Sequence, residues 1–272
     1  MERHWAPGSP GGSRLRALRE QAGRTQLWVE AEAELGTGYL QRIESGRVAQ
    51  PERATLERIL TALGARYSER REVMELFGYA VATPLPTEDD IAWACAVARR
   101  ELHEVPFPAY VIDCQTRLLA WNRYVPPLFG LSPRDPRLAG LAGRPLVAAW
   151  FAPASPLAPL VAEPDAFLPA LIRALRAETE SVRGEPWYAA LLADLLALPR
   201  FRHYWDRAER EQQPASAARA LVPVHLNVPG AGRLAFRLAS EHFTRDARFR
   251  FVYYFPANLA TMRQCAAWGE TA

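Results

Sequence analysis

The sequence predicts two domains, an all-α domain of five helices followed by an α+β domain with one antiparallel sheet covered by helices. Three observations support this prediction. The chain of 272 residues is long for one compact domain and comfortable for two. Apolar residues recur at helical spacing up to about residue 80, and the segment Thr83-Pro84-Leu85-Pro86 then breaks any helix. Beyond this break, short apolar stretches typical of strands flank a long helical region.

The first domain is expected over residues 13–82, after a disordered lead-in over residues 1–12. Its first helix begins near Ser13 and is closed by Gly23, and Thr25 then caps a second helix that runs to about Glu34. A short turn leads to a third helix that ends at Ser45-Gly46. Apolar spacing predicts two further helices, the fourth carrying Leu56, Ile59, Leu60 and Leu63, and the fifth carrying Val73, Leu76 and Phe77.

Residues 83–104 are expected to form a linker and a connecting helix with an acidic first turn. An apolar stripe on this helix fits signal transmission, a dimer contact or packing against its own domain; it consists of Ile91, Ala94, Ala98 and Leu102. The second domain follows over residues 105–272. We expect a hairpin over residues 109–113 and 118–122, helices over roughly 163–211 on one face of the sheet, and strands over 221–228, 234–239 and 248–255.

The segment 23–47 has the spacing of a helix-turn-helix, in which the second of two short helices enters the major groove of DNA. Leu40 and Ile43 are expected to face the core. Arg and Gln side chains can read base edges, and the residues expected to point outward from this second helix are Thr37, Gly38, Gln41 and Arg42. Phosphate contacts are expected at the start of the preceding helix and just past the second helix, from Thr25, Gln26 and Arg47.

Residues 14–64 resemble the lambda-repressor-like helix-turn-helix family, through LRALREQAG at 15–23, TQ at 25–26, YLQRIESGR at 39–47 and Pro51. The resemblance implies a partly buried ion pair between Arg19 and Glu44 that fixes the angle between their helices. The chain departs from the family where Glu30 replaces a small residue and Glu34 replaces the glycine of the turn. We therefore expect a shifted turn, and a cost of about 1 kcal/mol for Gly38 inside the third helix.

The nearly balanced charge of the first domain is also compatible with a function other than DNA binding. Arginines over residues 13–80 are about as numerous as acids, so the domain is not strongly basic. A five-helix domain of this kind could instead serve protein contacts, as in some antitoxins. Sequence-specific, salt-dependent binding to a palindromic double-stranded site separates the two functions. A homodimer is expected in the DNA-binding case, because twofold operators match twofold proteins.

The segment 107–113, followed by Leu118-Leu119-Ala120-Trp121-Asn122, resembles the opening hairpin of a PAS-like fold. Together with the helix-turn-helix and the late motif at 251–256, it makes the chain resemble the MmyB-like regulators from about Ser13 onward. This family pairs a lambda-repressor-like domain with a PAS-like ligand-binding domain. The resemblance therefore implies a DNA-binding transcriptional regulator with a cavity between the sheet and the helices of its second domain.

The predicted ligand pocket uses bulky apolar side chains of the second domain, namely Trp121, Trp150, Phe151, Phe167, Leu171, Trp187 and Leu191. Ligand cavities are mostly apolar with a few polar anchors, so this composition favours a long apolar ligand. One example is a fatty acid whose carboxylate meets an arginine. Ordinary core packing is the simpler explanation for most of these side chains, and Trp121 and Asn122 are better suited to stabilising the hairpin.

Enzyme signatures are not found in the sequence. It shows no nucleophile elbow, phosphate-binding loop or zinc-binding helix, so we predict no catalytic residues and no metal site. The five histidines are isolated, which argues against a haem cofactor. Cys95, Cys114 and Cys265 are far apart, and neither a signal peptide nor an apolar run of 18 residues is visible. These features predict a cytoplasmic protein that has no membrane partner.

Overall fold

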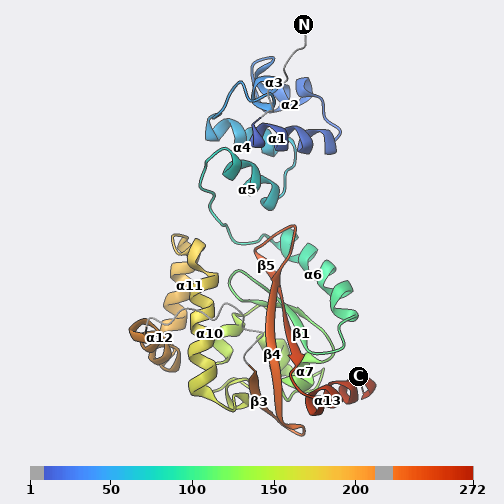
Figure 1. Cartoon of the computed structure of the whole chain (residues 1–272), viewed down its shortest axis with the longest axis vertical. Coiled ribbons are helices and arrows are strands. Elements are labelled where there is room, and N and C mark those ends of the chain that lie inside the picture. Colours follow the sequence, from blue (N-terminus) through green and yellow to red (C-terminus); the bar gives the residue numbers. More distant parts are fainter. Residues whose placement is uncertain (1–8, 212–222, 272) are drawn as a thin grey trace. The chain divides into compact units, whose positions relative to one another are not determined.

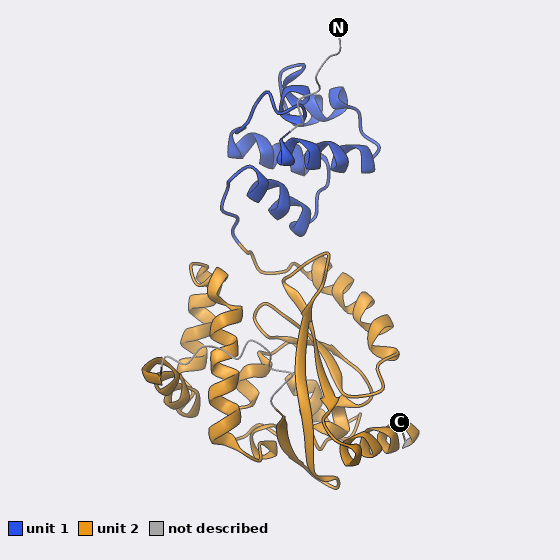
Figure 2. Cartoon of the chain, in the orientation of Figure 1, with its two compact units in different colours: residues 1–82 blue, residues 83–272 orange. Residues whose placement is uncertain are grey.

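The computed structural model describes residues 9–211 and 223–271, and the chain divides into two compact units (Figure 2). Unit 1 comprises residues 1–82 and unit 2 comprises residues 83–272. The described part of unit 1 is all-helical, with α1 (Pro10–Gln21), α2 (Gln26–Glu32), α3 (Tyr39–Glu44), α4 (Arg53–Ala62) and α5 (Tyr67–Leu76). Unit 2 combines helices with a five-stranded antiparallel sheet, which confirms the predicted fold class.

The helices of unit 1 enclose one apolar core, because each of them carries apolar residues at helical spacing on its inner face. Leu15 of α1 and Leu40 and Ile43 of α3 are fully buried there. The rest of this core comes mainly from α4 and α5, through Leu56, Ile59, Leu60, Val73 and Met74.

The first helix begins at Pro10 rather than near Ser13, so the expected disordered lead-in was too long. Ser9 caps this helix, because its hydroxyl accepts a hydrogen bond from the backbone N–H of Gly12 at 3.1 Å. A Cβ atom on Gly12 would lie 2.4 Å from the carbonyl oxygen of Ile43, so glycine lets α1 approach α3 closely. The Pro and Gly residues at 10–12 therefore form the first turn of α1. Residues 1–8 of the expected lead-in lie outside the described residues.

Unit 2 begins with the long helix α6 (Glu88–His103) and the hairpin of β1 (Ala109–Asp113) and β2 (Leu118–Trp121). The helical layer that follows contains α7 (Val125–Leu128), α8 (Pro136–Leu141), α9 (Leu146–Ala149), α10 (Pro164–Glu178), α11 (Pro186–Leu196) and α12 (Pro199–Glu211), with short 3-10 turns at Ala158–Leu160 and Glu180–Val182. The chain ends with β3 (Val224–Val228), β4 (Gly232–His242), β5 (Phe249–Pro256) and α13 (Leu259–Thr271).

The strands form one sheet in the order β2-β1-β5-β4-β3, with every neighbouring pair antiparallel. The first strand and the last strand of the chain lie side by side, with Val111 opposite Phe251. The strand expected over residues 221–228 begins at Val224, and positions 221 and 222 lie outside the described residues. Helix α13 was not predicted from the sequence.

Helices cover both faces of this sheet, and the expectation that they lie on one face was wrong (Figure 1). Every residue of β1 is buried, and alternate side chains point to opposite faces. Ala109 and Val111 pack against α6, whereas Tyr110 and Ile112 belong to the core under α7–α12. The apolar stripe of α6 is therefore occupied by its own domain. No helix in the part of the chain that the structure describes is long and apolar enough to cross a membrane.

Candidate functional site

The helix-turn-helix is formed by α2 and α3, and its second helix presents one face to the core and the other to solvent. Thr25 caps α2, since its hydroxyl accepts a hydrogen bond from the N–H of Trp28 at 3.1 Å. Leu40 and Ile43 of α3 are fully buried, as predicted. Gln41 and Arg42 of the same helix are exposed.

The turn between these helices is not shifted, which corrects the expectation from the sequence. Glu34 adopts φ +52° and so occupies the left-handed position for which glycine is customary. Gly38 lies at φ +79° and is the residue that precedes α3 rather than one inside it. The predicted cost of a glycine within the helix therefore does not arise, because the left-handed conformation at this position favours glycine.

Glu30 caps the second helix from a distance, a role that the sequence did not reveal. Its buried carboxylate accepts hydrogen bonds from the backbone N–H of Gly38 at 3.1 Å and of Leu40 at 2.9 Å. Gly38 has no side chain that could cap α3, and Glu30 supplies the missing acceptor. The substitution of a small residue by Glu30 and the presence of Gly38 are therefore two parts of one arrangement.

Glu34→Gly is expected to stabilise unit 1 by about 1 kcal/mol, because a left-handed conformation costs a side-chain-bearing residue roughly 1–2 kcal/mol. Chemical denaturation of the full chain measures the change. Ala31→Gly, within the neighbouring α2, is the matched control and is expected to destabilise by about 1 kcal/mol. Equal destabilisation by both substitutions would contradict strain at Glu34.

Arg19 of α1 and Glu44 at the end of α3 form a buried two-pronged ion pair. Arg19 Nε lies 2.7 Å from Glu44 Oε1, and Arg19 Nη2 lies 3.0 Å from Oε2. The hydrogen bond to Glu44 raises the pKa of Arg19 further above its ordinary value, so its charge is permanent. Gln26 joins the pair by donating from Nε2 to Glu44 Oε2 at 2.7 Å. The start of α2 is thereby oriented relative to α1 and α3.

The structure brings the predicted DNA contacts to two neighbouring places, the start of α2 and the region around α3. Thr25, Thr37, Gln41, Arg42 and Arg47 are exposed, whereas Gln26 and Gly38 are half-buried. The guanidinium of Arg42 lies 5.1 Å from the ring centre of Tyr39, a cation–π contact on the helix surface.

In unit 2, a cavity of about 60 Å³ lies between the sheet and α10. Three of the predicted pocket residues line it, namely Trp150, Phe167 and Leu171. Its other apolar walls come from β1, β4, β5 and the helical layer, through Ile112, Leu146, Val147, Leu175, Leu238 and Val252.

The same cavity has a polar end that the sequence analysis did not identify. Arg250 of β5 and Glu178 of α10 form an ion pair there, and both line the cavity. Thr116, which lies in the turn between β1 and β2 at φ +61°, also lines the cavity, as do Ser240, Tyr110 and Tyr254. Neither periodicity nor spacing marks these residues, because they come together only when the sheet and α10 are assembled.

A second cavity of about 190 Å³ lies beside the first, and Phe167, Leu171 and Leu238 line both. Its other apolar lining comes from Ala166, Ala170 and Val224. Glu163, Arg173 and His225 also line it.

Four of the predicted pocket residues line neither of these two cavities. Phe151 packs edge-to-face on Phe201 at 5.0 Å, and Leu191 is buried in the core of the helical layer. Trp121 is half-buried against the same core. Trp187 donates its indole N–H to the carbonyl oxygen of Thr83 at 2.7 Å. Bulky apolar side chains in a helical layer fill the interior, and only some of them face a cavity.

Asn122 ties the end of the β1–β2 hairpin to the chain that enters it. Its Oδ1 accepts from the N–H of Ala109 at 3.2 Å, and its Nδ2 donates to the carbonyl oxygen of Phe107 at 2.7 Å. The residue therefore stabilises the hairpin, which is the role the sequence favoured over ligand contact.

The segment between the last helix of unit 1 and α6 is held at defined points. On the side of unit 1, the hydroxyl of Tyr79 donates to the carbonyl oxygen of Pro51 at 2.7 Å. On the side of unit 2, the N–H of Thr83 donates to Glu185 Oε1 at 2.6 Å, and Trp187 holds its carbonyl oxygen.

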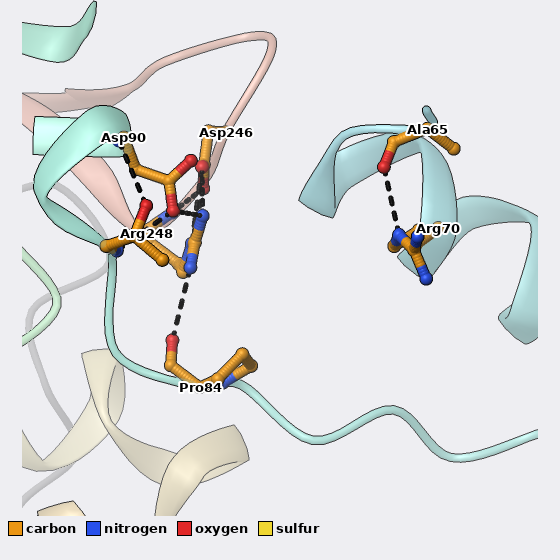
Figure 3. Close-up of polar contacts among 7 residues, drawn as sticks. Ala65, Arg70, Pro84, Asp90, Asp246 and Arg248 are labelled. Atoms are coloured by element: carbon orange, nitrogen blue, oxygen red, sulfur yellow. Dashed lines mark hydrogen bonds and ion pairs between the residues drawn. The ribbon is translucent and has the colours of Figure 1, made fainter. Parts of the chain in front are cut away.

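A buried arginine before β5 holds the next part of this segment (Figure 3). Arg248 Nη2 lies 2.7 Å from Asp246 Oδ2 and 2.9 Å from Asp90 Oδ2 in the first turn of α6. Its Nη1 donates to the carbonyl oxygen of Pro84 at 3.4 Å. One side chain therefore connects the β4–β5 turn, the linker and the start of α6.

Comparison with protein-family models gives two matches. Residues 96–267 match the MmyB-like transcription regulator ligand binding domain, and residues 12–73 match a helix-turn-helix domain. A comparison with curated proteins finds no match. The first matched range runs from α6 to α13, and the second runs from α1 into α5.

Proposed function

This chain belongs to the MmyB-like transcription regulators, and from this premise we propose that it binds a palindromic DNA operator as a homodimer and senses a small apolar ligand. The two matched domains make it a DNA-binding transcription regulator with a ligand-binding domain. In this proposal it acts in the cytoplasm by binding rather than by catalysis.

The operator-reading part is supported by the two-sided character of α3. Leu40 and Ile43 fix the helix in the core, so its outward side chains are presented from a rigid element. In the proposal, Gln41 and Arg42 read base edges in the major groove, with Thr37 and Gly38 at the start of the helix. The phosphates on either side are met by Thr25, Gln26 and Arg47. A twofold dimer would place two such helices on the two halves of a palindrome.

Arg42→Ala is expected to remove operator discrimination while leaving the fold intact. A two-pronged contact between arginine and guanine contributes about 1–3 kcal/mol of discrimination between bases. The variant should therefore lose its preference for one base at that position. Selection from a random DNA library, with the full chain and with the variant, measures this change at several salt concentrations. Arg71→Ala on α5, whose side chain is paired with Glu75, is the matched control.

Unchanged specificity in the Arg42→Ala variant would exclude this side chain from base reading. Binding of the full chain to no DNA sequence would instead favour the second function left open by the charge of unit 1, a module for protein contacts. A monomer on a single half-site would contradict the homodimer and leave the reading helix in place.

The ligand-sensing part is supported by the cavity between the sheet and α10, which has apolar walls and a small polar end. The neighbouring cavity adds space with a mostly apolar lining that also includes Glu163, Arg173 and His225, so a molecule with a long chain fits better than a compact one. A fatty acid and other long-chain compounds are the first candidates. Native mass spectrometry of the purified chain, followed by organic extraction, identifies what it carries, and repeated recovery of an empty chain that binds no such compound would contradict the proposal.

A further inference from the structure

The arginines of unit 1 differ in whether an acidic side chain compensates their charge. Five of the described arginines form ion pairs, namely Arg14, Arg16, Arg19, Arg53 and Arg71. Arg24, Arg42 and Arg47 are exposed, and the ion pairs among the described residues do not include them. These three lie just before α2, within α3 and just after α3. The near balance of arginines and acids in unit 1 therefore leaves uncompensated positive charge at the helix-turn-helix.

Both the backbone and the side chain of Arg24 are held in place. Its N–H donates to the carbonyl oxygen of Arg19 at 3.0 Å, and its own carbonyl oxygen accepts from Arg19 Nη1 at 2.9 Å. The same Arg19 side chain is paired with Glu44 at the end of α3. The buried ion pair that orients α1 and α3 therefore also fixes the backbone of Arg24 relative to α3.

Trp28, in the first turn of α2, holds the guanidinium of Arg24. The Cζ atom of Arg24 lies 4.1 Å from the ring centre of Trp28, which is a cation–π contact. The Trp28 side chain is 36% exposed, so its ring forms part of the surface rather than of the core. A guanidinium stacks through the face of its plane and carries its N–H donors at the edge. The contact with Trp28 therefore orders Arg24 and leaves its donors available to a ligand.

The chemistry of Arg24 fits a phosphate of the DNA backbone. A guanidinium is planar and permanently charged, and its paired donors match the oxygens of a phosphate. Arg24 directly precedes Thr25 and Gln26, which are proposed to meet phosphates. It lies outside α3, the helix that is proposed to read base edges, so its contact would position the protein without reading sequence.

We propose that Arg24, ordered by the ring of Trp28, binds a phosphate and positions the helix-turn-helix on double-stranded DNA. This inference rests on the proposed binding of an operator and adds to it a contact that the sequence did not indicate. Arg24 contributes affinity and no discrimination between bases. Trp28 is a positioning residue that acts on the DNA through Arg24. The contact gives a unit of nearly balanced charge a local attraction for a polyanion.

The test measures binding of the full chain to its selected operator and to a duplex of random sequence, between about 50 and 200 mM salt. Arg24→Ala is expected to weaken binding to both duplexes by the same factor, about tenfold at low salt. The slope of log affinity against log salt should become shallower by about 1 per half-site. Arg71→Ala is the matched control, because its charge is already paired with Glu75, and it should leave the slope unchanged.

Further variants test the role of the ring. Trp28→Ala should weaken binding to both duplexes about threefold, because the phosphate alone must then order the Arg24 side chain. Trp28→Phe should restore most of this affinity, since a phenyl ring also supports a stacked cation. Leu27→Ala is the matched control for the loss of an apolar side chain from α2, because Leu27 is 67% exposed. Circular dichroism checks that each variant is folded.

The possible results separate this inference from the function on which it rests. Weaker binding of Arg24→Ala to the operator alone would overturn it, because Arg24 would then read bases. Unchanged affinity and salt slope would also overturn it, and operator reading would stand if Arg42→Ala still loses discrimination. Binding of Trp28→Ala equal to that of the wild type would overturn the role of the ring. If the wild type binds neither duplex, both the inference and the proposed function are overturned.

Discussion

Arg19→Ala is expected to lower the free energy of unfolding of unit 1 by about 3–5 kcal/mol. Glu44 is only 6% exposed, and the substitution would leave its carboxylate with the single hydrogen bond from Gln26. A buried charge that loses its partner is strongly destabilising, and the angle between α1 and α3 depends on the same pair. Operator affinity should fall together with stability.

Hydrogen exchange at the amides of α1 and α3 measures this effect locally, so the unfolding of unit 2 does not obscure it. Arg16→Ala, on the same helix, is the matched control, since Arg16 pairs with Glu20 on the surface. The control should change exchange little, because exposed ion pairs contribute little to stability. Similar exchange in the two variants would show that the Arg19–Glu44 pair does not stabilise the helix-turn-helix.

The second large effect is expected in unit 2, where Arg248→Met should destabilise the fold by about 3–5 kcal/mol. The side chain of Arg248 is only 3% exposed, and that of Asp246 beside it is also buried, at 8%. Methionine fills much of the same volume but leaves both aspartates without their cation. The loss should appear first where Arg248 holds other segments, at Pro84 and at the start of α6.

Exchange of the amides near Asp90, together with chemical denaturation, measures the Arg248→Met effect. Arg137→Met is the control, because Arg137 pairs with Asp135 on the surface and should leave stability unchanged. Protection near Asp90 equal to that of the wild type would exclude Arg248 as the residue that holds this segment.

The pH dependence of the same region has a definite sign. Burial tends to raise the pKa of Asp90, but the hydrogen bond from the Thr87 backbone and the charge of Arg248 outweigh it, so the pKa is lowered. A lowered pKa means that ionised Asp90 stabilises the fold above about pH 4 and that this contribution is lost as the pH falls through the folded value. Arg248→Met should reduce the contribution.

The helix-turn-helix could be predicted because its signals are local. Thr25 is a typical helix cap, and the spacing of Leu40 and Ile43 places them on one face of a helix. Each of these signals lies within a few residues of the chain. The turn could not be predicted correctly, because Glu30 stabilises the start of α3 through side-chain hydrogen bonds across eight and ten residues. The sequence shows that Glu30 replaces a small residue. It does not show that the partners of this carboxylate are backbone N–H groups, because any residue type supplies such a group.

The pocket was only partly predictable for a different reason. Apolar spacing marks the inner face of a helix, but it does not distinguish Phe167, which faces a cavity, from Phe151, which faces other aromatic rings. The polar end depends on contacts between β5, α10 and the β1–β2 turn, whose residues are far apart in the chain. Thr116 and Arg250 have no unusual neighbours in the sequence, so only the assembled sheet identifies them.

The hydrogen bonds that hold both ends of the segment between the units determine how long the free part of the linker is. Tyr79 is held by unit 1 and Thr83 by unit 2, so only the residues at 80–82 lie between the fixed points. A fully extended chain spans at most about 14 Å between those two Cα positions. In a homodimer that associates through its ligand-binding domains, so short a linker would limit the spacing of the two half-sites that both DNA-binding domains can reach. Moving one half-site by half a turn of DNA, about 5 base pairs, would place it on the opposite face of the duplex, where the second helix-turn-helix could not reach it.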